Sequence, residues 1–167
     1  MRVNTAPTVG SLRTDETLSA VLSPTHDVWV EEARQLLVSA SLPGAASWER
    51  WSVVRYLSDQ FPEHFNAERA LVAALRPFVT AREMEMLEMG EEQVARLHLM
   101  LDRLGRRRGT AVEFARLGAE FLKALELWCV EVELAAARVE PDALPIEAQR
   151  ILSYLGAPLR MPCRALA

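Results

Sequence analysis

The feature that most constrains the fold of this chain is a helical repeat of apolar residues. Positions in the segment 47–76 recur at alternating steps of three and four, and they hold Val54, Leu57, Phe61, His64, Glu68, Leu71 and Leu75. An α-helix turns once every 3.6 residues, so this spacing places all of these side chains on one helical face. The segment therefore predicts a long amphipathic helix with a buried face.

Other segments share this period. We expect long helices over 24–40, 80–104 and 110–139, and short helices over 14–22 and 145–155. Ser23-Pro24 is typical of a helix start, with serine as the cap and proline at the first helical position. Thr80 and Glu83 have the spacing of a capping box. Pro62 lies inside the helix predicted over 47–76, where proline predicts a kink.

Short connections separate the long helices, and no segment shows the alternation typical of a strand. We therefore predict an all-α fold, an up-down-up-down four-helix bundle with short extra helices at its N- and C-terminal ends. The bundle is expected over residues 14–156. Residues 1–13 are predicted to be a flexible N-terminal segment, and residues 157–167 a C-terminal tail.

Composition narrows the classes of function. The 167 residues suit one domain, and 19 basic against 23 acidic residues give a net charge of -4, which argues against broad nucleic-acid contact. No apolar run approaches the roughly 20 residues of a membrane span. Cys129 and Cys163 lack CxxC spacing, so neither a disulfide framework nor a zinc site is indicated. With no signal-peptide pattern at the start, we expect a cytoplasmic protein.

Four polar residues interrupt the apolar faces of the predicted helices. His26 lies on the face of helix 24–40, His64 in the middle of the face of helix 47–76, and His98 beside the face of helix 80–104. Glu68 follows His64 by one helical turn and shares its face. A carboxylate that faces a core is costly unless it is paired or ligated, so these residues mark a candidate site.

Two interpretations of this set remain open. Histidines on facing helices of a bundle can converge with a carboxylate on a metal ion, and imidazole with carboxylate suits iron, zinc or manganese. Core-facing histidines are also often simply hydrogen-bonded, and His64 and Glu68 could pair with each other.

The segment His64-Phe65-Asn66-Ala67-Glu68, preceded by His26-Asp27, resembles the hemerythrin-like cation-binding (HHE) family. The resemblance spans residues 18–155, and Pro145-Ile146-Glu147 fits the acidic segment that follows the fourth helix in that family. It implies a four-helix bundle around a di-iron centre, in proteins that carry or sense oxygen, sense iron or handle nitric oxide.

Carried over by position, the resemblance implies five metal ligands. His26 would be the ligand of the first helix, and His64 and Glu68 those of the second, with Glu68 bridging. His98 would be the ligand of the third helix and Glu133 the acidic ligand of the fourth. The expected cofactor is iron, as a di-iron centre or a single ion.

Val94 and Trp128 stand where the family has two further histidines, so the chain resembles a degenerate member. We therefore expect a protein that binds a metal ion with an incomplete ligand set, in sensing, storage or an oxygen-related role, and that is not an enzyme. Its expected partners are the metal ion and a small diatomic ligand, without nucleic acid or membrane. The alternative is a metal-free bundle, with Trp128 filling the cavity, that regulates or binds a protein partner or a second copy.

Overall fold

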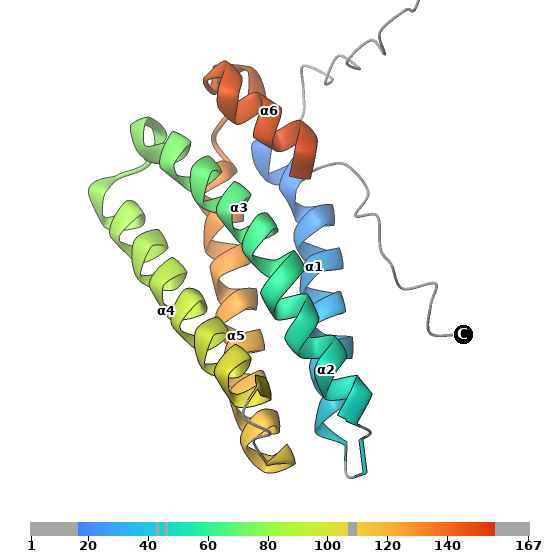
Figure 1. The fold of residues 1–167 in the computed structure, drawn as a ribbon. Coiled ribbons are helices and arrows are strands. Elements are labelled where there is room, and N and C mark those ends of the chain that lie inside the picture. Colours follow the sequence, from blue (N-terminus) through green and yellow to red (C-terminus); the bar gives the residue numbers. More distant parts are fainter. Residues whose placement is uncertain (1–16, 43, 46, 107–109, 156–167) are drawn as a thin grey trace, which may run out of the picture.

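A computed structural model describes residues 17–42, 44–45, 47–106 and 110–155, and within these ranges the chain is all-α, without strands (Figure 1). The predicted flexible segment 1–13 and tail 157–167 lie outside the described residues. The elements are α1 (Leu18–Ser41), α2 (Ser47–Arg55), η1 (Tyr56–Gln60), α3 (Phe61–Leu75), η2 (Arg76–Phe78), α4 (Ala81–Arg106), α5 (Ala111–Ala136), η3 (Pro141–Ala143) and α6 (Ile146–Leu155).

Helix α1 begins before the predicted start at Pro24. Thr17 caps it by accepting a hydrogen bond from the Ala20 amide, and the helix continues through Pro24 without a break. The expectation of a separate short helix over 14–22 was therefore wrong for the described residues. An internal proline costs about 3 kcal/mol. Leu18 and Leu22 both lie in the core, and the free energy gained by burying them offsets the cost of the proline, so the helix extends to Leu18.

The segment predicted as one helix over 47–76 has an irregular turn before Pro62. Helix α2 begins at Ser47 as expected, and α3 ends at Leu75. Between them, η1 is a π-turn in which the Phe61 amide donates to the Tyr56 carbonyl, five residues back. A π-turn inserts one residue into the helical repeat. It lets the helix continue at Pro62, which has no N–H and cannot donate a backbone hydrogen bond.

The last two long helices each begin with a capping box, of which only the one at Thr80 was predicted. Thr80 and Glu83 form the reciprocal hydrogen bonds of a capping box at the start of α4. Thr110 and Glu113 form a second box at the start of α5. Each box satisfies amides that the first helical turn leaves without acceptors.

In Figure 1, α1, α3, α4 and α5 run alongside one another, with α6 across one end. Helix α5 packs against both α1 and α4, and α2 packs against α1 and α4. Helix α6 packs on α3 and α1, and it confirms the predicted short C-terminal helix. The Leu18 amide donates to the Val139 carbonyl, which joins the start of α1 to the chain just after α5.

Aromatic side chains fill the interior between these helices. Trp29 stacks on Phe61 with ring centroids 5.3 Å apart, and Phe61 also contacts Phe65 and Phe121. Trp128 contacts Trp29 and Phe65 edge-on or tilted. Such pairs contribute roughly 0.5–1.5 kcal/mol each beyond their buried area. The polar residues of the candidate site therefore lie against a tightly packed aromatic core.

Candidate functional site

Helix α1 places His26 at the centre of a charged cluster. The imidazole is 2% exposed, on the same face as the buried Leu22, Trp29 and Ala33. Its Nδ1 lies 2.7 Å from Glu133 Oε1 on α5, and its Nε2 lies 3.3 Å from Glu68 Oε1 on α3. Three helices thus contribute to one buried contact.

Both carboxylates face ring nitrogens of His26, and this controls its charge. Burial is the largest single influence on the pKa of His26 and lowers it, but the hydrogen bonds and charges of Glu68 and Glu133 outweigh burial. The pKa therefore rises above its usual value. A neutral ring would direct one lone pair at a carboxylate, whereas an imidazolium donates to both.

Two buried atoms beside this contact lack partners. Among the described residues, neither Glu68 Oε2 nor His64 Nε2 has a hydrogen-bond partner. Glu68 is 0% exposed, and the His64 ring packs against Trp29 with centroids 5.0 Å apart. Burial lowers the pKa of His64, and the charge of His26 adds to this, although Glu68 and Glu63 act in the opposite direction. An unpartnered neutral imidazole and carboxylate oxygen thus share one face of α3.

His98 serves a different contact from the one expected of it. Its Nε2 donates to the Leu57 carbonyl in the π-turn, and its ring stacks on Phe61 at 4.8 Å. The Phe61 amide is directed to the Tyr56 carbonyl, and Pro62 has no N–H, so the helix itself leaves the Leu57 carbonyl without a donor. His98 supplies the missing donor. No local sequence pattern indicates this role, because it depends on the π-turn.

The two positions where the family pattern has histidine are packed core. Val94 and Trp128 are both 0% exposed. Trp128 lies against Gly90 of α4, where an added Cβ would come within 2.9 Å of Trp128 Cδ1. Its Nε1 has no hydrogen-bond partner in the described part of the chain. The indole therefore occupies interior space that the small Gly90 leaves open.

The geometry separates Glu133 from Glu68. The two nitrogens of an imidazole point away from each other, so groups bonded to Nδ1 and Nε2 lie on opposite sides of the ring. Glu133 contacts Nδ1 and Glu68 contacts Nε2. The structure thus brings His26, Glu68 and Glu133 together, with His64 one turn from Glu68. It does not gather three or more acidic, histidine or cysteine side chains into a metal-binding group within the described residues.

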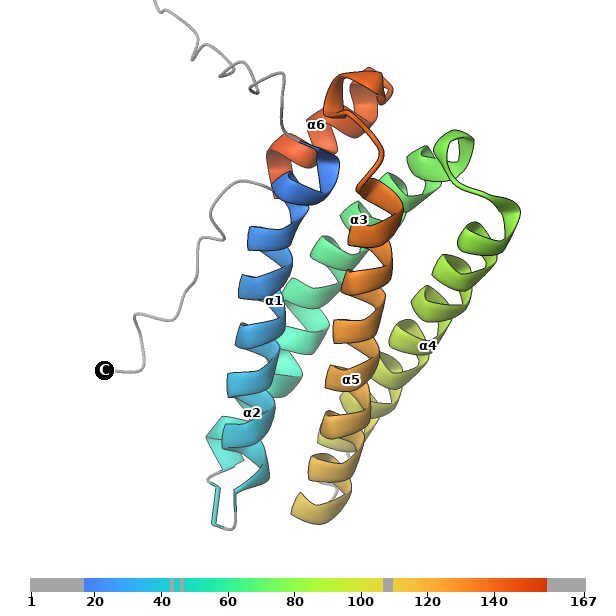
Figure 2. The same cartoon turned by 180° about the vertical axis from the view of Figure 1, so that it is seen from behind.

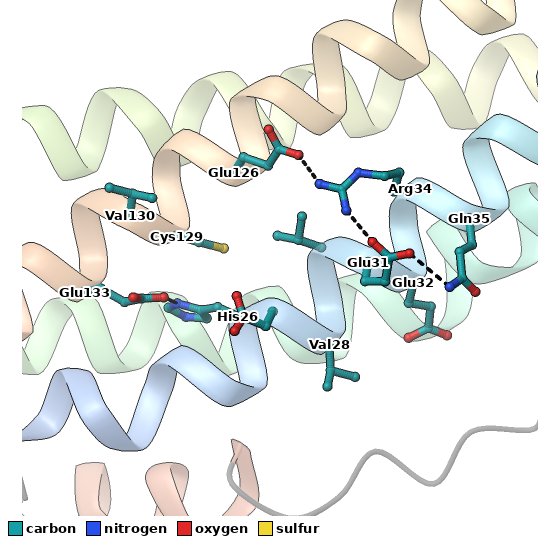
Figure 3. A pocket seen from close by; sticks show the side chains of 12 residues that line it. His26, Val28, Glu31, Glu32, Arg34, Gln35, Glu126, Cys129, Val130 and Glu133 are labelled. Carbon is teal, nitrogen blue, oxygen red and sulfur yellow. Dashed lines mark hydrogen bonds and ion pairs between the residues drawn. The ribbon is translucent and has the colours of Figure 1, made fainter.

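A groove of about 750 Å³ opens beside His26 on the outer face of α1 and α5 (Figure 3). Arg34 pairs with Glu31 and, at 2.6 Å, with Glu126 across the groove. Burial raises the pKa of Glu32 to about 7. Burial also raises the pKa of the Cys129 thiol, which keeps it protonated and unreactive. The helical pattern of the sequence did not indicate this groove, because it depends on how α1 and α5 pack.

Comparisons with known proteins returned no match, whether to family models, to curated proteins or to solved structures. None of the described helices combines the length and apolar character needed to cross a membrane.

Proposed function

We propose that this protein is a hemerythrin-like up-down-up-down helical bundle that binds one metal ion between α1 and α3. The ligands are His26 through Nε2, His64 through Nε2, and Glu68. Iron is the first candidate, because two imidazoles and one carboxylate are the donor set of many non-haem iron sites and leave coordination positions open. The role is sensing or storage, with a small diatomic molecule as a suitable further ligand.

The carrying observation is the pair of unpartnered atoms beside His26. A buried polar atom without a partner costs about 1–3 kcal/mol, so native proteins usually satisfy such atoms with a group, a water or an ion. His64 Nε2 and Glu68 Oε2 lie on one face of α3, and Glu68 Oε1 already lies 3.3 Å from His26 Nε2. Two atoms that ligate the same ion are about 3.0–3.4 Å apart.

Glu133 has a supporting role in this proposal. It accepts from Nδ1 of His26 at 2.7 Å, which fixes the ring and leaves Nε2 as the ligating nitrogen. Carboxylates commonly orient metal-binding histidines in this way. The ion would replace the proton on Nε2. One ion rather than two follows from His98, which donates to Leu57, and from the packed Val94 and Trp128.

Metal content tests the proposal directly. The protein is reconstituted anaerobically with Fe(II), Mn(II) or Zn(II), desalted, and measured by elemental analysis. We expect about one equivalent in the wild type, and loss of most of it in His64→Ala and Glu68→Gln. His98→Gln is the matched control and keeps its metal. A wild type without stoichiometric metal refutes the proposal, and so does equal loss in His98→Gln and His64→Ala.

A second candidate is a metal-free bundle that acts through protein contacts. Trp128 at 0% exposure favours it, because an indole fills interior volume at a ligand position. The imidazolium of His26 between two carboxylates is also satisfied without an ion. This candidate predicts that a chelator leaves the melting temperature unchanged, whereas a bound ion would stabilise the folded state and a chelator would lower it.

A further inference from the structure

Helix α6 bridges the two helices that hold the proposed ligands. The backbone of α1 lies close to that of α5 but approaches that of α3 much less, whereas α6 packs on both α1 and α3. Ala148, Leu152 and Leu155 form the buried face of α6. Figure 2 shows α6 at the end of the bundle where α1 begins and α5 ends. The contact between α1 and α3 is therefore completed by a short amphipathic helix.

The last turn of α6 is hydrogen-bonded to both of these helices. The Tyr154 hydroxyl donates to Glu63 Oε1 on α3 at 2.7 Å, and Thr25 Oγ1 on α1 donates to the Leu155 carbonyl at 3.1 Å. Glu63 and Thr25 each directly precede one of the two proposed histidine ligands. Because one residue rises only about 1.5 Å along a helix, the last turn of α6 lies at the level of those histidines.

The groove on α1 and α5 does not lead an ion to the proposed ligands. His26, His64 and Glu68 are all buried, and the groove is lined by His26 but not by His64 or Glu68. Glu133 also lines it and lies against Nδ1 of His26, the nitrogen that faces away from the proposed ion. An ion therefore needs another opening, and the contacts of α6 beside both histidines mark one.

Helix α6 is suited to open as a unit. It has 10 residues, and isolated helices shorter than about 12–15 residues are marginal in water, so α6 depends on its docking. The chain before it is held separately, because Leu144 is buried and the Val139 carbonyl accepts from the Leu18 amide. Elements held by few buried contacts open at a lower free energy than the whole fold. Release of α6 therefore leaves the four long helices in place.

We propose that α6 is a gate over the site between α1 and α3. Its last turn releases Thr25 and Glu63, the helix leaves α1 and α3, and the opening admits a metal ion to His64 and Glu68 or lets it leave. The gate controls the rate of exchange rather than the amount of metal bound. The identity of the ion rests on the proposed function, whereas the opening of α6 does not require a metal.

Chemical labelling of His64 tests the opening without a metal ion. Diethyl pyrocarbonate acylates neutral imidazole, and mass spectrometry of the full-length, metal-free protein gives a separate rate for each histidine. Tyr154→Phe keeps the ring but removes the hydrogen bond to Glu63, and we expect it to label His64 about threefold faster than the wild type. Leu152→Ala removes buried contacts of α6 and is expected to raise that rate at least about tenfold. Should Leu152→Ala not fold, Tyr154→Phe decides alone.

Ser153→Ala is the matched control. The Ser153 hydroxyl donates to the Gln149 carbonyl within α6, so this variant loses a hydrogen bond that does not join α6 to another helix. We expect it to label His64 at the wild-type rate. His98, whose ring lies against the π-turn, reports general unfolding and is expected to be labelled at the same rate in every variant.

Ion release tests the gate in the loaded protein. The protein is loaded with Zn(II), and transfer of the ion to an excess of a chromophoric chelator is followed by stopped-flow absorbance. We expect Tyr154→Phe and Leu152→Ala to speed release by the same factors as labelling, with metal content unchanged, because the opening of α6 precedes both events. Glu126→Gln weakens the bridge to Arg34 over the groove on α1 and α5, and it is expected to release the ion like the wild type.

Three results would overturn the gate. The first is equal labelling of His64 in the wild type and both α6 variants. The second is equal acceleration at His64 and His98, which would mean general unfolding. The third is faster ion release in Glu126→Gln but not in Tyr154→Phe, which would assign the route to the groove. If the wild type holds no metal, the proposed function fails, whereas the labelling rates of His64 still decide whether α6 opens.

Discussion

The contact between His98 and the π-turn allows a sharp test of the structural reasoning. In His98→Leu the apolar bulk is kept, but the Leu57 carbonyl loses its donor. Leu57 is 1% exposed, so water cannot readily replace the lost bond. An unsatisfied buried carbonyl costs about 1–3 kcal/mol, and loss of the ring contact with Phe61 adds about 0.5–1.5 kcal/mol. Because His98 is only half-buried, we expect a loss of about 2 kcal/mol in the free energy of unfolding.

A double-mutant cycle with Pro62 separates this explanation from a general packing effect. In Pro62→Ala, residue 62 regains an N–H that can donate to the Leu57 carbonyl or allow η1 to return to regular α-helix. His98→Leu should then cost about 1 kcal/mol less in the Pro62→Ala background than in the wild type. His98→Gln, which keeps a donor, should recover part of the stability.

Urea denaturation followed by far-ultraviolet circular dichroism gives the four free energies of the cycle. The m-values must agree among the variants for the comparison to hold. If the losses in the free energy of unfolding of the two single variants add up to that of the double variant within about 0.3–0.5 kcal/mol, His98 does not compensate for the proline. A neutral His98→Leu would contradict the contact itself.

Three further predictions concern stability. Glu32 has a folded-state pKa of about 7, above its unfolded value, so its burial lowers the free energy of unfolding progressively as pH rises from about 4.5 to 7. Glu32→Gln should therefore stabilise the protein by about 1–2 kcal/mol at pH 8 and not at pH 4. Equal effects at both pH values would contradict this prediction. Gly90→Ala should destabilise by about 1–3 kcal/mol in thermal melts, because its methyl group would press on Trp128, and a stabilised variant would show that the gain in helix propensity wins. Pro24→Ala should raise the melting temperature, since the restored amide can donate to the Ala20 carbonyl, and an unchanged value would mean that α1 bears no cost at this proline.

Local sequence signals predicted much of the helical structure. The cap at Thr80 is formed by side chains within a few residues, so it could be identified directly, and the predicted start at Ser47 agrees with the first residue of α2. The start of α1 was misplaced at Pro24, since proline favours a first turn but buried leucines upstream extended the helix. At Pro62, where a kink was predicted, the structure has a π-turn at Tyr56–Gln60, and this form was not predicted.

The candidate site, too, was predictable from the sequence only in part. Periodicity identified His26, His64 and Glu68 as polar residues on buried faces, and the structure confirms that all three are buried. Periodicity could not identify which carboxylate meets which nitrogen. Those contacts join residues 42 and 107 positions apart, so they depend on how the helices pack rather than on local spacing.

The sequence by itself therefore determined which side chains turn inward, because an amphipathic helix orients each residue through its own repeat. Only the tertiary structure decided what those inward side chains meet. It directed His98 to a backbone carbonyl left without a donor, placed Glu133 and Glu68 on opposite nitrogens of His26, and packed Trp128 against Gly90. The physical reason is that burial of a polar group is a property of one helix, whereas its partner is a property of the packing between helices.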